Sequence, residues 1–350
     1  LKAREADQAI SLGLIDATGY SDDVIANIRQ RTGLDEKEKV RTVSLEDYAK
    51  SYTKKKDFSS KDKIALVYAE GAIYDQDGEK GTISDDKYVK LLRKIREDEK
   101  FKAIVLRVNS PGGSALASEN IWRELNLAKQ AGKKVVVSMG DYAASGGYYI
   151  ACMGDKIIAE PNTLTGSIGV FSMIPNAHEL FNDKIGITFD TVKTTRYSTG
   201  INAVFEMSEG EKALMQQNTV NTYEKFLARV AEGRKMSRDE VHKIAQGRVW
   251  VGDKAKQLGL VDEIGDLDRA IAVAAELAGV EKYRLTEYPF RKEPLQEFIE
   301  NLTGQGDDEG IEAKILEKEL GGYYPYFKQA KELLKMQGVQ ARLPVFVDFK

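Results

Sequence analysis

The sequence predicts an α/β fold made of parallel βαβ units. From residue 64 onward, short apolar runs rich in β-branched residues alternate with longer stretches that carry apolar residues at helical spacing. Two of the apolar runs end in glycine-rich turns, and a helical stretch follows each turn. Alternating strands and helices are typical of a parallel sheet covered by helices.

The individual elements follow from the same pattern, taken in chain order. Ser21 is the expected cap of a first helix that ends near Gly33, with acidic residues in its first turn. We expect strands at 64–69, 104–108, 134–139 and 156–159, and helices at 88–99, at 118–131 and from residue 145 onward. Two capping boxes, Ser208-Glu-Gly-Glu211 and Ser237-Arg-Asp-Glu240, open two later helices.

The most informative segment is Asp141-Tyr-Ala-Ala-Ser-Gly-Gly-Tyr-Tyr-Ile-Ala151. It places Ser145 after an apolar strand and at the start of an apolar helix. A serine at such a junction is held on a tight turn, so its hydroxyl projects from the backbone and the amides that follow point to where an anion forms. This arrangement is the one that a nucleophile needs.

A second turn, Asn109-Ser-Pro-Gly-Gly-Ser114, follows another apolar strand. Gly112 and Gly113 allow the backbone to turn sharply and to approach a ligand closely, because they have no Cβ. An oxyanion hole requires backbone N–H groups about 3 Å from the developing negative oxygen. We therefore expect Gly113 and Gly146 to be the two donors.

Four segments resemble the signal peptide peptidase A family of Ser-Lys serine proteases. They are Asn109-Ser-Pro-Gly-Gly-Ser, Ala144-Ser-Gly-Gly-Tyr-Tyr-Ile-Ala, Leu164-Thr-Gly-Ser-Ile-Gly-Val and Gly247-Arg-Val-Trp-Val-Gly. The similarity extends from about Lys63 to Leu277. It implies a ClpP/crotonase-like fold and a bacterial cell-envelope enzyme that degrades cleaved signal peptides.

The resemblance also assigns roles to individual residues. Ser145 corresponds to the nucleophile, and Gly113 and Gly146 correspond to the oxyanion donors. Ser167, in Thr165-Gly-Ser-Ile-Gly169, corresponds to a serine that helps to orient the general base. Such chemistry requires no metal and no organic cofactor.

One element of the family pattern is missing. In short members of the family, the lysine base follows the strand that is predicted here at Ile187-Thr-Phe-Asp-Thr-Val-Lys193. Ser198 or its neighbour stands at the expected position, and the next lysine is Lys212. Lys193 corresponds to a lysine that is not the base in those members. We therefore expect the base to lie outside this chain.

An internal repeat explains the missing lysine. The segment from Asp7 to Tyr20 matches the segment from Asp253 to Asp266 at an offset of 246, with seven of fourteen residues identical. The second copy closes the Ser145 domain, so the first copy resembles the end of a similar domain upstream, and the chain begins at Leu1 without methionine. In the long, duplicated form of the family, the N-terminal domain supplies the lysine. We therefore expect this chain to be the C-terminal half of such a protein.

Four regions follow from these patterns. Residues 1–52 are the expected tail of a preceding domain, and residues 53–63, which are polar and charged, form a linker. Residues 64–277 form the domain that carries the nucleophile. Residues 278–350 form a helical C-terminal extension with assembly contacts, because apolar residues recur at helical spacing near 295–302, 311–320 and 326–336.

Composition narrows the possible partners. The chain of 350 residues is 42% hydrophobic and 31% charged with a net charge of −3, so neither nucleic acid nor an anionic membrane surface is indicated. One cysteine, Cys152, and two histidines do not suffice for a structural zinc site. No apolar run is long enough to span a membrane. From the long form we expect an anchor outside this chain, a homo-oligomer, and a catalytic domain on the extracytoplasmic, periplasmic side of the cytoplasmic membrane.

Signal peptides are apolar, so the pockets beside the nucleophile should be apolar too. An extended substrate is expected to add a strand along Gly112, Gly113 and Ser114. The side chains expected to line the pockets are Leu116, Tyr142, Met173 and Ile174.

Three alternatives remain open from the sequence. His178 or His242 could serve as the base of a Ser-His-Asp triad, although both are expected on structural or solvated helix faces. A crotonase-type acyl-CoA enzyme would use the two oxyanion donors and tolerate the loss of Ser145. A scaffold would bind peptides or assemble subunits without cleaving them.

Overall fold

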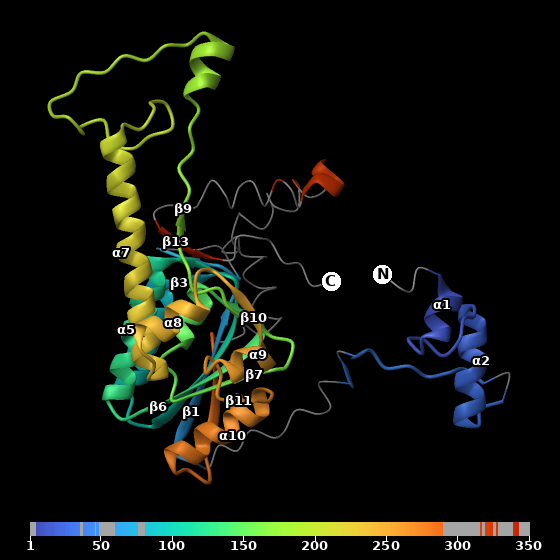
Figure 1. The fold of residues 1–350 in the computed structure, drawn as a ribbon. Coiled ribbons are helices and arrows are strands. Elements are labelled where there is room, and N and C mark those ends of the chain that lie inside the picture. The colour runs from blue at the N-terminus through green and yellow to red at the C-terminus, as the bar shows by residue number, and fades with distance from the viewer. Residues whose placement is uncertain are drawn as a thin grey trace, which may run out of the picture. The chain divides into compact units, whose positions relative to one another are not determined.

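The computed structural model describes residues 5–35, 38–45, 47–48, 60–75, 81–289, 316, 319–324, 327 and 339–342. The chain divides into two units, residues 1–56 and residues 57–350 (Figure 1). The first unit contains α1 (Ala6–Ser11) and α2 (Ser21–Thr32). The expected cap of α2 shifts by one residue: Tyr20 is the N-cap, and its N–H donates to the Asp23 carboxylate at 2.9 Å. Ser21 is instead the first helical residue, because an acidic residue at the third helical position can satisfy the cap backbone by itself.

The second unit is built on a twisted sheet with the strand order β10-β8-β6-β4-β1-β12, to which β7 and β11 are added beside β6. The strands of this sheet are β1 (Lys63–Glu70), β4 (Phe101–Ser110), β6 (Lys134–Ala144), β7 (Lys156–Ala159), β8 (Leu164–Gly166), β10 (Val249–Val251), β11 (Glu263–Ile264) and β12 (Arg284–Tyr288). All pairs are parallel except β10 with β8. The predicted parallel sheet is confirmed.

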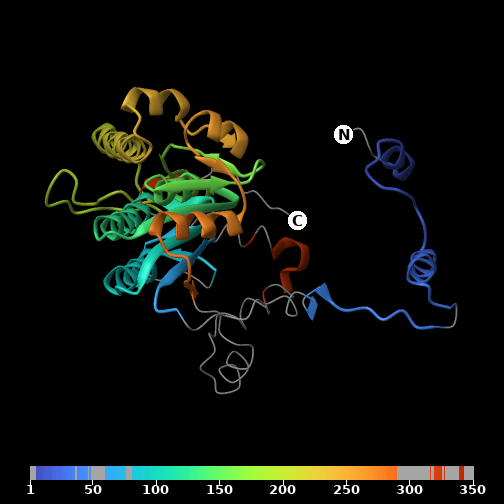
Figure 2. The same ribbon diagram turned by 90° about the horizontal axis from the view of Figure 1, so that it is seen from below.

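Helices cover both faces of this sheet (Figure 2). They are α4 (Asp85–Glu97), α5 (Ala115–Gln130), α6 (Gly146–Ala151), α7 (Glu209–Arg234), α8 (Arg238–Ile244), α9 (Gly252–Gln257) and α10 (Leu267–Ala278). Alternate residues of one strand enter different cores: Val135 and Val137 pack with α5 and α6, whereas Val136 packs with Val273 of α10. A strand buried on both faces is expected to carry a continuous apolar run, as β6 does from Val135 to Val137.

A second, smaller sheet has the order β3-β2-β5-β13-β9. Its strands are β2 (Ile73–Tyr74), β3 (Ile83–Ser84), β5 (Gly112–Ser114), β9 (Phe171–Ser172) and β13 (Val339–Arg342). β5 is the glycine turn that follows β4. The second sheet therefore starts at the carboxyl end of the first.

The segment between β9 and α7 projects away from the sheets (Figure 1). It contains a π-helix, η1 (Leu180–Ile185), and an irregular stretch up to Met207. The strand predicted at 187–193 is wrong. Its β-branched residues favour a strand, but no described strand pairs with them, and Phe189 and Val192 are largely exposed.

The described parts of residues 278–350 include β12, β13 and a short 3₁₀-helix, η2 (Gly321–Tyr323). The helix predicted at 295–302 lies outside the described residues, as do most of those at 311–320 and 326–336. Both strands pair with elements of the second unit, a contribution that the helical spacing did not predict.

Candidate active site

Ser145 lies between β6 and α6 in a conformation that L-residues rarely adopt, with φ 54° and ψ −114°. Its N–H donates to the Gly166 carbonyl at 2.9 Å, and its carbonyl accepts from the Tyr149 N–H at 2.8 Å. A sparsely populated conformation of this kind persists only where neighbours over-determine it, and such positions cluster at active sites. The strand-to-helix junction expected for Ser145 is confirmed.

The helix α6 is anchored by its own tyrosines. Tyr148 donates from its hydroxyl to the Leu260 carbonyl at 2.9 Å, and Tyr149 donates to the Glu119 carboxylate at 2.7 Å. Glu119 also accepts from Arg229 of α7 at 2.6 Å. Burial would raise the pKa of Glu119, but the hydrogen bonds from Arg229 and Tyr149 outweigh it and lower that pKa. The ionised Glu119 thus ties α5, α6 and α7 together behind Ser145.

The two glycine turns meet beside Ser145. A Cβ at Gly112 would lie 2.6 Å from the Gly146 nitrogen, and a Cβ at Gly146 would lie 3.1 Å from the Gly112 Cα. A Cβ at Gly113 would lie 1.9 Å from the Ile73 carbonyl oxygen of β2. The absence of side chains is therefore a steric requirement at all three positions. It brings the backbone of β5 against the start of α6, as an oxyanion site between them requires.

The side chain of Ser114, the remaining residue of this turn, has a structural role. Its hydroxyl contacts the Asp75 carboxylate and accepts from the Ala117 N–H at 3.2 Å, which caps α5. Only its backbone is directed to a neighbouring strand, where it pairs with Gln340.

Ser167 also has a left-handed conformation, with φ 46°, and its N–H donates to the Arg248 carbonyl at 2.7 Å. Within the described part of the chain, its hydroxyl has no hydrogen-bond partner. The Ser145 hydroxyl donates to the Gly169 carbonyl at 3.3 Å, two residues beyond Ser167. The Thr165–Gly169 segment thus lies next to the Ser145 side chain and presents a free hydroxyl there.

A cavity of about 340 Å³ adjoins this segment. It is lined by Ser167, Gly169, Val170, Phe171, Tyr223, Gln246, Gly247 and Arg342. The four side chains expected to line a pocket, Leu116, Tyr142, Met173 and Ile174, are not among them. Leu116 is 61% exposed and Met173 is 42% exposed, and their role in binding stays a prediction.

The lining residues that sequence reasoning missed fall into two groups. Val170 ends the quoted motif that contains Ser167, and Phe171 follows it. Gln246 directly precedes Gly247, which begins another quoted motif, so proximity in sequence could have indicated these four residues. Tyr223 of α7 and Arg342 of β13 are far from these motifs in the sequence, and the tertiary fold brings them to the cavity. No pattern in the sequence around either residue indicates a place in the cavity wall.

Among the described residues, no lysine has a hydrogen bond to the Ser145 hydroxyl, which donates to the Gly169 carbonyl. Lys193 lines a different cavity in the projecting segment, and Lys212 pairs with Glu209 at 2.8 Å. Lys133 is buried, and burial lowers its pKa. However, it precedes β6 at the end opposite Ser145, and the eleven residues of this strand span roughly 33 Å from first to last.

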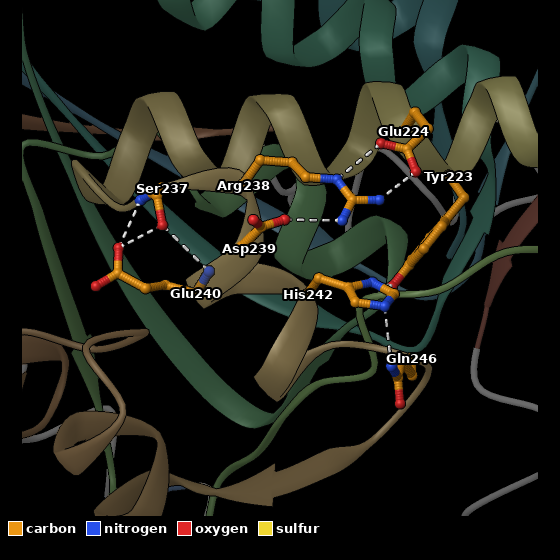
Figure 3. Close-up of polar contacts among 8 residues, drawn as sticks. All are labelled: Tyr223, Glu224, Ser237, Arg238, Asp239, Glu240, His242 and Gln246. Carbon is orange, nitrogen blue, oxygen red and sulfur yellow. Dashed lines mark hydrogen bonds and ion pairs between the residues drawn. The ribbon is translucent and has the colours of Figure 1, made fainter.

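Both histidines are engaged elsewhere. Figure 3 shows His242 of α8 between the Tyr223 hydroxyl, at 2.9 Å, and the Gln246 side chain, at 3.1 Å. His178 contacts the Val204 carbonyl and the Asn182 amide. Neither ring has a hydrogen bond to Ser145 in the described part of the chain, which argues against a Ser-His-Asp triad.

The fold and this site define a class: an α/β protein that holds a strained serine where two glycine turns meet. Two family models agree with it, since peptidase family S49 matches residues 127–281 and Clp protease matches residues 55–165. The chain is 34% identical over 257 residues to protein MJ0651 of Methanocaldococcus jannaschii, covering 71% of this chain and 82% of that one. This chain therefore belongs to peptidase family S49 and has the ClpP-like fold that the sequence predicted.

Two relatives are considerably longer. Protease 4 of Salmonella typhi is 41% identical over 300 residues, which cover 85% of this chain and 48% of that protein. The chloroplastic serine protease SPPA of Arabidopsis thaliana is 37% identical over 284 residues, which cover 79% of this chain and 41% of that protein. The chain thus spans about half the length, or less, of these relatives. None of its described helices has the length and apolar character needed to cross a bilayer.

Proposed function

We propose that this chain carries the nucleophile and the oxyanion donors of a serine endopeptidase that works by Ser-Lys acyl-enzyme catalysis. The observation that carries the proposal is Ser145, held at a left-handed φ where the turns of Gly112 and Gly146 meet. Membership of a peptidase family supports the same reaction. Ser167 lines the adjoining cavity, and its hydroxyl, which has no hydrogen-bond partner among the described residues, is available to orient the base.

The steps follow from the roles of these groups. The Ser145 oxygen attacks the carbonyl carbon of the scissile peptide bond while its proton passes to a neutral lysine amine. The negative oxygen of the tetrahedral intermediate accepts hydrogen bonds from the N–H groups of Gly113 and Gly146. The intermediate collapses, the protonated lysine transfers its proton to the leaving amine, and an ester on Ser145 remains. Water, deprotonated by the same lysine, then hydrolyses the ester.

The lysine base is proposed to come from an upstream half of the same protein. Two observations support this source: the repeat that begins at Asp7, and the absence of a lysine hydrogen bond to the Ser145 hydroxyl among the described residues. A lysine can act as a base near neutral pH only if burial lowers its pKa well below about 10.4. A contact between two copies of a domain would provide such burial. In this proposal, residues 1–52 are the tail of the upstream domain, residues 53–63 the linker, and residues 64–277 the domain that carries the nucleophile. Residues 278–350 are proposed to provide assembly contacts, although their described part contributes two strands as well as a short helix.

The proposed substrates are cleaved signal peptides, which are apolar and bind extended. The proposed setting is a homo-oligomer anchored in the cytoplasmic membrane by a segment outside this chain, with the catalytic domain on the periplasmic side. The resemblance to signal peptide peptidase A and the longer relatives support these assignments.

The test is hydrolysis of an apolar signal-like peptide by the full-length parent protein, with and without Ser145→Ala. We expect the variant to lose at least about 10³-fold in rate, as when a catalytic nucleophile is removed. An unchanged rate of peptide hydrolysis would mean that Ser145 is not the nucleophile. Peptide binding without any turnover by the unaltered protein would favour a scaffold.

A further inference from the structure

A row of four hydrogen-bonded side chains ends at the cavity that Ser167 lines. The Arg248 guanidinium donates to Oε1 of Gln246 at 2.6 Å, and Nε2 of Gln246 lies 3.1 Å from Nε2 of His242. Nδ1 of His242 lies 2.9 Å from the Tyr223 hydroxyl oxygen (Figure 3). Tyr223 and Gln246 both line the cavity, whereas Arg248 is exposed. We call these four side chains the relay.

The arginine sets the direction of every hydrogen bond in the relay. A guanidinium has donors only, so the oxygen of the Gln246 amide faces Arg248 and the amide nitrogen faces His242. The amide nitrogen also only donates, so Nε2 of His242 accepts and the proton of the ring lies on Nδ1. Nδ1 therefore donates to the Tyr223 oxygen. The proton of the Tyr223 hydroxyl is left to point away from His242.

The Tyr223 hydroxyl keeps this proton. Burial raises the pKa of the phenol, against a smaller lowering by the Gln246 backbone N–H. The Tyr223 ring also contacts the His242 ring edge-on, with 5.9 Å between the ring centroids and 62° between the ring planes. A half-buried phenol that is held in this way presents its O–H group to an acceptor in the cavity.

The loop that carries Gln246 is fixed against the segment of Ser167. Gln246 has a left-handed φ of 61°, and the neighbouring Arg248 carbonyl accepts from the Ser167 N–H at 2.7 Å. A non-glycine residue persists in such a conformation only where its surroundings over-determine it. The same cavity wall contains Gly169, whose carbonyl accepts from the Ser145 hydroxyl. The relay therefore ends at a defined place close to the nucleophile.

The cavity wall favours a ligand that carries an oxygen acceptor. The described residues that line it include no carboxylate, and Arg342 is the charged residue among them. An extended peptide that adds a strand along β5 uses its main-chain groups in that pairing, and its side chains alternate between the two sides. A side chain is therefore the part of the peptide that can enter the cavity, whose volume is about 340 Å³.

We propose that Tyr223 is a specificity-determining residue, which donates a hydrogen bond to a side-chain oxygen of the bound peptide, and that His242, Gln246 and Arg248 are positioning residues that direct its proton. The inference rests on the proposed function, which makes a peptide the occupant of the site. It adds to the apolar recognition a preference for a polar side chain, such as glutamine, at one position of the substrate. An apolar side chain there leaves the Tyr223 proton unpaired, which weakens binding.

The position of the ring proton tests the relay directly. The chain contains two histidines, so His178→Gln leaves His242 as the only ring in a sample made with ¹⁵N-histidine. Nitrogen NMR spectra at alkaline pH, where imidazoles are neutral, distinguish Nδ1–H from Nε2–H. We expect the Nδ1–H form, and the spectrum of the unaltered chain should contain the same signal. The Nε2–H form would overturn the proposal.

Gln246→Glu should reverse the relay with little change of shape. A carboxylate only accepts, so at alkaline pH the proton of the His242 ring is expected to move from Nδ1 to Nε2. A proton that stays on Nδ1 would mean that residue 246 does not set the direction, and the relay would be refuted.

Peptide selectivity tests the role of Tyr223 in the full-length protein. The probes are fluorogenic apolar peptides in pairs, which carry either glutamine or methionine, two side chains of similar length, at successive positions. We expect the ratio of kcat/KM for glutamine over methionine to exceed one at a single position. Tyr223→Phe should lower that ratio about tenfold, as for the loss of one hydrogen bond. A ratio that Tyr223→Phe leaves unchanged at every position would contradict the proposal.

Two histidine variants separate positioning from packing. His242→Asn keeps an N–H donor near the place of Nδ1, whereas His242→Leu has no donor. We expect His242→Leu to lower the glutamine ratio as far as Tyr223→Phe does, and His242→Asn to retain most of it. His178→Leu is the matched control, because the His178 ring contacts Val204 and Asn182 instead. Equal losses for the asparagine and leucine variants would argue for packing alone and defeat the proposal.

Peptide binding separates this proposal from the proposed function. Fluorescein-labelled forms of the same peptides are titrated with the full-length Ser145→Ala protein, and binding is followed by fluorescence polarisation. If binding shows a glutamine preference that Tyr223→Phe removes, but the unaltered protein never cleaves peptides, the role of Tyr223 stands and the proposed function fails. If serine-dependent cleavage occurs without a glutamine preference at any position, the proposed function stands and the role of Tyr223 does not.

Discussion

Strain at Ser145 is held in place by contacts on both sides of the residue. A non-glycine residue in such a conformation costs on the order of 1–3 kcal/mol, which its surroundings must offset. Here the Gly166 carbonyl fixes the Ser145 N–H, and the two tyrosines of α6 fix the turn that follows. The turn of Gly112 and Gly113 is fixed as tightly, because β2 and β13 flank its backbone.

Gly113→Ala is predicted to disrupt the oxyanion turn. The new methyl group would lie 1.9 Å from the Ile73 carbonyl oxygen, so the backbone of β5 must move. We expect peptide hydrolysis by the full-length protein to fall by about 10²-fold or more, the effect of losing one oxyanion donor. Gly132→Ala is the matched control: its φ is 86°, and a Cβ there meets nothing within 4 Å. If both variants lost activity equally, the turn would have no special role.

Glu119 is predicted to make stability depend on pH. Its pKa is lowered in the folded state, so its contribution is fully present above the unfolded value near 4.5 and is lost as the pH falls through the lower folded value. Glu119→Gln should therefore destabilise the chain at pH 7 and flatten the fall of stability below about pH 4.5. Urea unfolding at pH 7 and at pH 3.5 measures both effects. Parallel profiles for the variant and the unaltered chain would contradict the role of Glu119.

Among the elements, the two helices that open with capping boxes were the most predictable from the sequence. Both capping boxes are present: the Ser208 and Ser237 hydroxyls accept from the N–H groups of Glu211 and Glu240, and each carboxylate accepts from the cap N–H. These interactions are local, so three or four residues determine them. β13 is the opposite case. Its partner Gly113 is more than two hundred residues away, and no local pattern indicates that pairing.

Ser237→Ala is predicted to cost about 1 kcal/mol in the free energy of unfolding, because the N–H of Glu240 loses its acceptor. Ser237→Gly should cost only a few tenths of a kcal/mol, since glycine leaves room for water at an N-cap. Denaturant titration of the two variants compares them directly. A glycine variant less stable than the alanine variant would contradict the capping account.

At the scale of the whole molecule, sequence reasoning predicted the parallel sheet, the strand-to-helix junction at Ser145 and the meeting of the two glycine turns. These features belong to strand-turn-helix units, and each such unit is formed by residues that are contiguous in the sequence. It did not predict the cavity wall, where Tyr223, Gln246 and Arg342 come from three separate elements. The strand expected before Lys193 also failed, because a strand needs a partner that local sequence does not supply.

Lys193→Ala and Lys212→Ala are predicted to leave serine-dependent hydrolysis by the full-length protein within about twofold of the unaltered rate, as expected for surface substitutions away from the site. Lys193 lies in the projecting segment, and Lys212 is paired with Glu209. Steady-state kinetics on the two variants measure this. A rate reduced a hundredfold or more by either substitution would return the base to this half of the protein.

The most direct measurement is hydrolysis of a fluorogenic apolar peptide by this chain alone and by this chain mixed with the upstream half, with Ser145→Ala as the control in both. We predict no serine-dependent cleavage by the chain alone and cleavage when the upstream half is supplied. Serine-dependent cleavage by the chain alone would mean that the base lies within it and would contradict the account.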